Sequence, residues 1–177
     1  MDANEFPKKI VLGFNLHEKL RYGENPHQEG AIYTSLKNPV LTKLNGKQLS
    51  YNNYLDIFAA LQISRTFPKN IGSVIIKHGN PCGVSIHKDN NKSFMLAHKC
   101  DPISSFGGIV SFNNNVDKAI AELLSNIFLE CVVAPSFDKG ALEILNKKKN
   151  LRLLELNKEN IQIDNKSTFR SILGGIL

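Results

Sequence analysis

The chain has 177 residues, of which 42% are hydrophobic, and a chain of this length can bury a core without disulfides or a structural metal. Its 22 lysines and arginines outnumber 16 aspartates and glutamates, so the net charge is +6. This mild excess suits anionic small molecules. No basic run is interleaved with aromatic residues, and the one tight cluster, 147–149, ends a predicted helix, where cations complement the helix dipole. Both features argue against nucleic-acid binding.

The cysteines and the apolar runs indicate where the protein works. Cys82, Cys100 and Cys131 are odd in number and far apart, so they predict neither a disulfide framework nor a cysteine-rich zinc site, and they suit a reducing cytoplasm. The N-terminus lacks the apolar core of a signal peptide. No apolar run approaches the roughly 18 residues that span a membrane. We predict a cytoplasmic protein that binds neither membranes nor nucleic acid.

The chain begins with irregular segments and then becomes regular. Residues 1–18 are predicted to form an N-terminal arm or linker. The segment 21–28 follows as a turn-rich stretch, because its glycine and proline exclude a regular helix. A short strand at 31–33 and a helix at 56–67 come next, and beyond them strands and helices alternate. The predicted strands are 73–77, 109–112, 131–134 and 151–156, and the predicted helices are 92–99, 117–129 and 138–147.

This alternation predicts an α/β fold, a three-layer α/β/α sandwich whose mainly parallel sheet is covered on both faces. We assign residues 19–157 to this domain. The last twenty residues turn polar and then end on an apolar run with two glycines. We therefore expect 158–177 to begin a connection to a second subdomain that is absent from this chain.

The most informative stretch is 77–83, which directly follows the apolar run 73–76. It places Lys77 and His78 at the end of a predicted strand, where ligands of open α/β sheets bind. A lysine supplies a fixed positive charge, and a histidine exchanges a proton near neutral pH. This pair suits a reaction in which a nucleophile loses a proton while negative charge develops on a carbonyl oxygen. The alternative is a solvated lysine beside a histidine bonded to the backbone.

A partial match to a zinc signature also needs an explanation. Zinc-dependent nucleobase deaminases carry H-x-E followed by P-C-x-x-C. This chain has His27 and Glu29 in the first spacing and Pro81 and Cys82 in the second, but Ser85 stands where the second cysteine belongs. A serine hydroxyl does not replace a thiolate as a zinc ligand. We therefore predict that no zinc is bound.

Three polar segments are further candidates. In the loop 101–108, glycines let backbone N–H groups approach a ligand and Phe106 can stack on a flat ring. Arg21, beside Tyr22, offers a planar fork of donors for a phosphate or a heterocycle. The third segment, 50–53, is a polar stretch before the predicted helix at 56. The alternatives are a loop that contains glycines for purely steric reasons, an arginine that is simply solvated and, for 50–53, a helix cap.

Five segments taken together resemble one family. They occur in the order 20–28, 44–53, 77–83, 101–108 and 147–152. They resemble the PurH family of bifunctional purine biosynthesis proteins, within its AICAR transformylase domain, and the resemblance runs from about residue 6 to 177. It implies transfer of a formyl group from 10-formyltetrahydrofolate to the 5-amino group of AICAR (5-aminoimidazole-4-carboxamide ribonucleotide). The product, FAICAR, is then cyclised to IMP by a separate domain.

The resemblance also implies a fold and an assembly. The family's transformylase is a tandem of two cytidine-deaminase-like units without catalytic zinc, and it is active as a homodimer with shared sites. By this resemblance 19–157 is the first unit. The second unit, with a further catalytic asparagine and much of the folate pocket, is expected beyond residue 177. The alternative is a non-catalytic nucleotide-binding fragment or subunit that needs a separate second half.

The resemblance assigns roles to individual residues. His78 matches the family's proton acceptor, and Lys77 matches the group that stabilises charge on the formyl oxygen or on the departing folate nitrogen. One departure is Gly79, where the family often has threonine or another small residue. The residues implied to contact AICAR are Arg21, Tyr22, Gly23, Tyr51, Asn52, Phe106 and Gly107, and those implied on the folate side are Ile103, Ser104 and Glu130.

Overall fold

The computed structural model describes residues 7–68, 71–157 and 169–176. Its strands are β1 (Asn15–Lys19), β2 (Ala31–Thr34), β3 (Leu41–Asn45), β4 (Gly72–Lys77), β5 (Asn80–Ile86), β6 (Gly108–Phe112), β7 (Leu129–Ala134), β8 (Arg152–Leu156), β9 (Ser171–Ile172) and β10 (Gly175–Ile176). Its helices are α1 (Tyr51–Ser64), α2 (Asn90–Cys100), α3 (Lys118–Ser125) and α4 (Lys139–Leu145).

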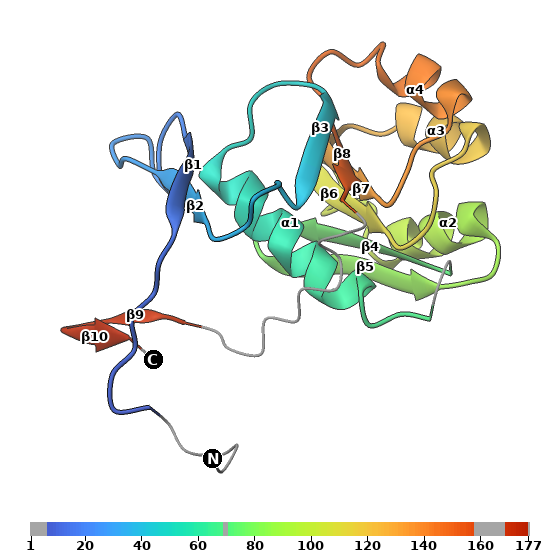
Figure 1. Ribbon diagram of the computed structural model, residues 1–177. Helices are drawn as coiled ribbons and strands as arrows, with labels where there is room; N and C mark the ends of the chain where they lie inside the picture. Colours follow the sequence, from blue (N-terminus) through green and yellow to red (C-terminus); the bar gives the residue numbers. More distant parts are fainter. Residues whose placement is uncertain (1–6, 69–70, 158–168, 177) are drawn as a thin grey trace.

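A six-stranded sheet in the order β3-β8-β7-β6-β4-β5 forms the centre of the molecule. Helix α1 covers one face of this sheet, and α2, α3 and α4 cover the other (Figure 1). The pairs β1–β2 and β9–β10 form separate two-stranded sheets. This arrangement confirms the predicted α/β class and its three layers.

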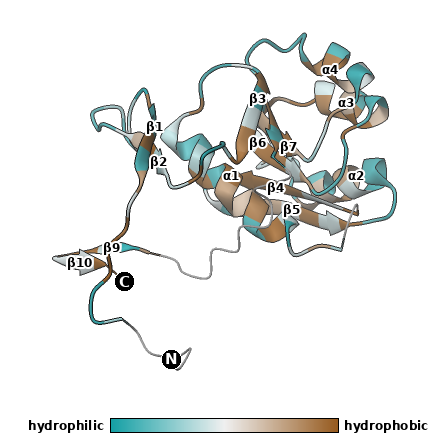
Figure 2. Cartoon of the chain, viewed as in Figure 1, coloured by the Kyte–Doolittle hydropathy of each residue, from teal (hydrophilic) through white to brown (hydrophobic). Residues whose placement is uncertain are grey.

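Alternation along the central strands explains why both faces are covered. In β4, the Ile75 side chain packs into the cluster formed with α2, α3 and α4, whereas Val74 and Ile76 pack on the side of α1. In β6, Val110 and Ile109 divide between the two faces in the same way. Successive side chains of a strand point to opposite faces, so continuous apolar runs are buried on both. Figure 2 shows these central strands as some of the most hydrophobic parts of the chain.

The prediction of a mainly parallel sheet is wrong. The pairs β6–β7 and β7–β8 are parallel, but β3–β8, β4–β5 and β4–β6 are antiparallel. Strand β5 was not predicted from the sequence because Pro81 and Gly83 are unusual within a strand. Proline is tolerated at a sheet edge, and β5 is an edge strand. The first parallel crossover consequently runs from β5 through α2 to β6. Strand β4 lies between these two strands and is antiparallel to both.

A tight turn creates the unpredicted hairpin. Lys77 pairs with Asn80, and the two residues between them have positive φ angles, 53° at His78 and 74° at Gly79. Two-residue hairpin loops with positive φ at both positions match the natural twist of antiparallel strands. The stretch 77–83 is therefore a strand end, a turn and a new strand.

The second large difference from the prediction is where α1 begins. The helix starts at Tyr51 rather than at residue 56, because Ser50 and Asn53 form a capping box. In this box Ser50 Oγ accepts a hydrogen bond from the Asn53 N–H, and Asn53 Oδ1 accepts one from the Ser50 N–H, both at 3.1 Å. The alternative reading of 50–53 as a cap is thus confirmed, and Tyr51 and Asn52 lie in the first helical turn.

The predicted domain limits stay predictions. The first six residues of the expected arm, residues 158–168 of the expected connection and residue 177 lie outside the described part of the chain. Within the described residues, no helix combines the length and the apolar character that crossing a membrane requires.

Candidate functional site

The candidate site lies where Lys77 ends β4, along a border of the main sheet that is formed by the ends of several strands. The sheet edge here means this row of strand ends and not the outermost strand. Ile76 pairs with Ile109 in the antiparallel strand β6, so the end of β4 lies beside the start of β6. Strands β7 and β8 run parallel to β6 and begin at this same edge, and β3 ends there before α1 begins. The edge therefore combines the carboxyl ends of β3 and β4 with the amino ends of β6, β7 and β8, rather than carboxyl ends alone.

Lys77 and His78 open the turn after β4, and other elements hold this turn in place. Lys77 Nζ donates a hydrogen bond to the carbonyl oxygen of Phe106 at 2.7 Å. The backbone N–H groups of His78 and Gly79 donate to the carboxylate of Asp56 on α1, at 3.3 and 2.6 Å. His78 is exposed and Lys77 is half-buried. A fixed positive charge and a titratable group thus lie side by side on an anchored turn.

The loop before β6 carries an aromatic ring to this edge. The Gly107 N–H donates to the carbonyl oxygen of Phe128 at 2.8 Å, and the φ of Gly107 is 76°, a value that favours glycine. The rings of Phe106 and Phe128 lie 5.0 Å apart between centroids. Hydrogen bonds from Ser104 hold the pKa of Asp101 below its usual range, and the Ser104 N–H lies 2.9 Å from Asp101 Oδ1.

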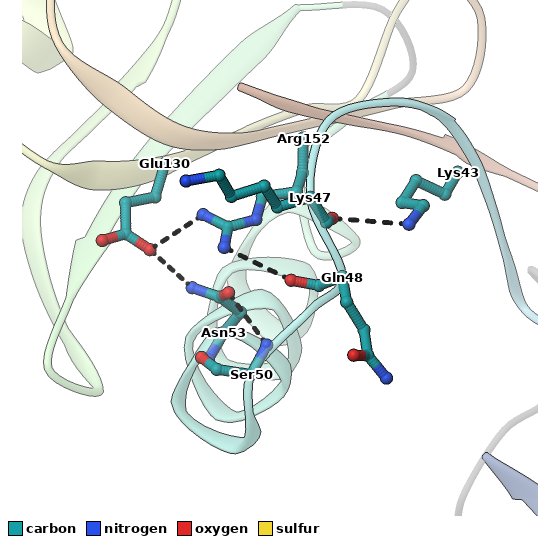
Figure 3. A network of polar contacts seen from close by, with 7 residues as sticks. All are labelled: Lys43, Lys47, Gln48, Ser50, Asn53, Glu130 and Arg152. Atoms are coloured by element: carbon teal, nitrogen blue, oxygen red, sulfur yellow. Dashed lines mark hydrogen bonds and ion pairs between the residues drawn. The ribbon is translucent and has the colours of Figure 1, made fainter. Parts of the chain in front are cut away.

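Glu130, at the start of β7, is held by a polar network (Figure 3). Its Oε2 accepts hydrogen bonds from Asn53 Nδ2 at 2.8 Å and from Arg152 Nη1 at 3.3 Å. Arg152 also donates through Nη2 to the carbonyl oxygen of Gln48 at 3.3 Å. The side chain of Arg152 is 15% exposed and that of Glu130 is 41% exposed. The carboxylate is therefore fixed while part of it remains open to solvent.

Strand β1 and the segment that follows it lie against the start of α1 and the residues just before it. Gln48 Nε2 donates to Glu18 Oε1 at 2.9 Å, and the Tyr54 hydroxyl donates to Glu18 Oε2 at 3.1 Å. Burial and the neighbouring Glu18 carboxylate raise the pKa of Tyr54 well above its usual range. Asn52 Nδ2 lies 3.4 Å from the carbonyl oxygen of Glu24. These contacts bring the turn 21–28 to the same end of the sheet domain.

Within that turn, Arg21 is exposed and Tyr22 is half-buried. The Arg21 Cζ atom lies 5.9 Å from the centroid of the Tyr22 ring. The Gly23 N–H closes the turn by donating to the carbonyl oxygen of Gln28 at 2.7 Å. A cavity of about 470 Å³ borders the turn, and Arg21 is among the residues that line it.

The predicted site residues fall into two groups. The first group lies on elements that meet at the sheet edge. It contains Tyr51, Asn52, Lys77, His78, Ile103, Ser104, Phe106, Gly107 and Glu130. Arg21, Tyr22 and Gly23 lie on the neighbouring turn, which the Asn52–Glu24 contact joins to α1. Among the described residues, no group of three or more His, Cys, Asp or Glu side chains is placed to hold a metal ion.

A second cavity, of about 480 Å³, opens beside Glu130. Its lining includes Lys47, Phe128, Lys148 and Arg152. Lys148 Nζ donates to the carbonyl oxygen of Ile127 at 2.7 Å, and burial lowers the pKa of this lysine. The cavity lining thus combines several cationic side chains with the carboxylate of Glu130 and the aromatic ring of Phe128.

Comparison with known proteins identifies the family. The sequence profile of the family described as AICARFT/IMPCHase bienzyme matches residues 1–177. The chain belongs to this family. It is 50% identical over 183 residues to the bifunctional purine biosynthesis protein PurH of Prochlorococcus marinus (strain MIT 9515), covering 97% of this chain and 35% of that protein. It is 48% identical over 177 residues to PurH of Clostridium botulinum (strain Loch Maree / Type A3), covering 98% and 35%.

The chain therefore spans about a third of the length of these curated PurH relatives. Among solved structures, form 1 of Acinetobacter baumannii RibD aligns with a TM-score of 0.45 and 16% identity, covering 56% of this chain and 35% of that chain. That similarity is too low to support an argument about this AICARFT/IMPCHase family member.

Several residues that hold the site together were not predicted from the sequence. Asp56 was identified only as the first residue of a predicted helix, and Asn53 only as a cap. Arg152 lay in the motif 147–152 without a role. For Arg152 the motif was a usable signal, whereas the contacts of Asp56 and Asn53 depend on how α1 lies over the sheet.

Proposed function

We propose that this chain forms part of an AICAR formyltransferase of de novo purine biosynthesis. A formyl group moves from 10-formyltetrahydrofolate to the 5-amino group of AICAR, and the product is FAICAR. The whole bifunctional protein also cyclises FAICAR to IMP. Family membership supports this proposal. The observation that carries it is the anchored turn that presents Lys77 and His78 beside Phe106.

The proposed chemistry follows from the positions of these two side chains. The amine of AICAR is a weak aromatic nucleophile. As its nitrogen attacks the formyl carbon, His78 accepts the proton that the amine loses. The bond between the formyl carbon and the folate nitrogen then breaks, and that nitrogen takes up a proton. Lys77 stabilises negative charge on the formyl oxygen or on the departing nitrogen. Positioned proton transfer of this kind contributes about 10²–10⁴-fold to a rate.

The proposed binding roles divide along the same edge. AICAR contacts the turn through Arg21, Tyr22 and Gly23, the start of α1 through Tyr51 and Asn52, and the loop before β6 through Phe106 and Gly107. The folate lies toward Ile103, Ser104 and Glu130. An arginine fork suits a phosphate, and the exposed Phe106 ring suits a flat heterocycle.

The proposed assembly is a cytoplasmic homodimer with shared sites. The three free cysteines suit a reducing compartment. A second candidate function is a non-catalytic half that binds the nucleotide and needs a separate second half. The share of the relatives that this chain covers, 35%, favours keeping this candidate.

Calorimetric titration with AICAR tests the nucleotide part of the proposal. We expect saturable binding by the 177-residue chain and its loss in Arg21→Ala. Lys139→Ala, at the start of the distant α4, serves as a matched control that removes a positive charge elsewhere and should bind normally. Equal binding by Arg21→Ala and the wild type would contradict the assigned role of Arg21.

A further inference from the structure

We propose that Asp56 is a positioning residue for the proton acceptor of this enzyme. The Asp56 carboxylate holds the turn of His78 and Gly79 in its left-handed conformation through the backbone, without touching the substrates. This inference rests on the proposed function, because it gives Asp56 a part in formyl transfer.

Support from outside the hairpin matters because His78, which carries a side chain, occupies the first position of the turn. Its φ of 53° suits a two-residue hairpin loop but is less favourable for a residue with a Cβ atom than for glycine. A Cβ atom added to Gly79 would meet nothing within 4 Å, so crowding around Gly79 does not impose the conformation. Within the hairpin, Lys77 pairs with Asn80, and Asn80 Nδ2 donates to the His78 carbonyl oxygen at 3.0 Å. The remaining constraint comes from α1 through two hydrogen bonds. Asp56 Oδ2 accepts the His78 N–H at 3.3 Å, and Asp56 Oδ1 accepts the Gly79 N–H at 2.6 Å.

The position of Asp56 on α1 links this turn to Glu130. Asn53 and Asp56 are three residues apart, and residues at this spacing lie on the same side of a helix. Asn53 donates to Glu130, whereas Asp56 accepts from the turn that carries His78. One face of α1 therefore fixes two parts of the proposed site that come from different strands. A change at Asp56 should move His78 relative to Glu130 and Phe106.

Bonds from backbone N–H groups to an ionised carboxylate are among the stronger hydrogen bonds in proteins. Replacing Asp56 with asparagine puts an NH₂ group in place of one acceptor oxygen, so at least one of the two bonds is lost. The chemistry depends on placing His78 within reach of the amine proton, and a displacement of about 1 Å can cost about 10²-fold in rate. Binding of AICAR depends on other side chains.

The first measurement uses nuclear magnetic resonance on the 177-residue chain. In the wild type, the amide protons of His78 and Gly79 should exchange slowly with solvent, because the Asp56 carboxylate accepts both N–H groups. In Asp56→Asn at least one of these two amide protons should exchange markedly faster. Unchanged exchange at both amides in Asp56→Asn would overturn the proposal, and this result does not depend on any catalytic activity.

The second measurement is steady-state kinetics in the complete protein that contains this chain. We expect Asp56→Asn to lower kcat by about 10²-fold and to leave the KM for AICAR within about twofold. Asp89→Asn is the matched control, because the Asp89 carboxylate also accepts two backbone N–H groups, those of Asn91 and Lys92. It caps α2, which follows the other end of β5, so its kcat should be unchanged.

Gly79→Pro provides a second route to the same test should Asp56→Asn fold poorly. Proline fixes φ near −65° and has no N–H to donate, so this variant loses both the left-handed conformation and the bond to Asp56 while it retains the Asp56 side chain. Unchanged kcat in Asp56→Asn or in Gly79→Pro would overturn the positioning role and leave the proposed function standing. A wild-type protein without formyl transfer would overturn the proposed function itself, while amide exchange at His78 and Gly79 would still report on the turn.

Discussion

His78 is the residue on which the proposed chemistry depends most. Its side chain lies on an exposed turn, so its removal should disturb the fold little. We expect His78→Ala in the complete protein to lower kcat by at least about 10²-fold, the lower end of what a positioned proton acceptor contributes. AICAR binding should be nearly intact when measured by calorimetry. Wild-type turnover in this variant would exclude His78 from the mechanism.

Cys131 offers a residue-level test of the buried sheet. Burial raises the pKa of its thiol from 9.0 to about 12. The neutral thiol therefore contributes stability that is fully present below pH 9 and is lost as the pH rises toward 12, because the unfolded chain ionises first. The loss attributable to this group is about 1.4 kcal/mol per pH unit.

Urea denaturation of the wild type and of Cys131→Ala between pH 8 and about pH 10 measures this loss. The alanine variant should be less stable throughout, because it leaves a cavity, and its stability should fall less steeply above pH 9. Parallel slopes in the two proteins would show that the thiol ionises as easily in the folded chain as in the unfolded one. Cys100, which is exposed, makes Cys100→Ala the control.

At the scale of elements, the capping box of α1 connects helix stability to the site. Ser50→Ala removes the acceptor for the Asn53 N–H, and loss of such a cap costs about 1 kcal/mol. We expect a decrease of that size in the free energy of unfolding, measured in urea. Ser50→Asp should retain most of the stability because aspartate also caps helices. Ser125→Ala, at the exposed end of α3, is the control, and an equal effect in both alanine variants would exclude a special role for the cap.

The elements also show what the sequence could predict. Apolar runs identified β4, β6, β7 and β8 because each is buried on both faces, and helical spacing identified the four helices. Strands β3 and β5 of the main sheet were not predicted. Strand β3 has no continuous apolar run, and the proline and glycine of β5 are more typical of a loop. The start of α1 was missed because Asn53, a polar residue, is buried in the structure through its bonds to Ser50 and Glu130.

Most of the candidate site came from the family resemblance, whereas the long-range contacts that support the site had no local signal in the sequence. Asn53 and Glu130 are 77 positions apart, and Asp56 and His78 are 22 apart. No local pattern encodes such contacts. They arise because α1 begins at the sheet edge where β4 ends and β7 begins. Predicting them would have required the order of strands in the sheet, which depended on the missed β5.

For the whole molecule, the proposed function requires that the site be covered. Ile103 is 87% exposed and Phe106 is 60% exposed, and both lie in the loop 101–108, which Lys77 contacts through the Phe106 carbonyl oxygen. Formyl transfer requires a site from which water is largely excluded, since electrostatic stabilisation weakens in water. The chain spans about a third of its PurH relatives. We therefore expect the isolated chain to transfer no measurable formyl group and expect activity once the remaining region of the enzyme is supplied.

This expectation can be checked by mixing the purified chain with the separately produced remaining region and following the consumption of 10-formyltetrahydrofolate. Activity should rise to saturation with the added region, because assembly follows mass action. The chain carrying His78→Ala should assemble to the same extent, as sedimentation would show, and yet remain inactive. Comparison of the wild-type chain with the His78→Ala chain therefore separates the effect of covering the site from the chemical role of His78. Full activity of the chain alone would mean that Ile103 and Phe106 work uncovered and that no second half is needed.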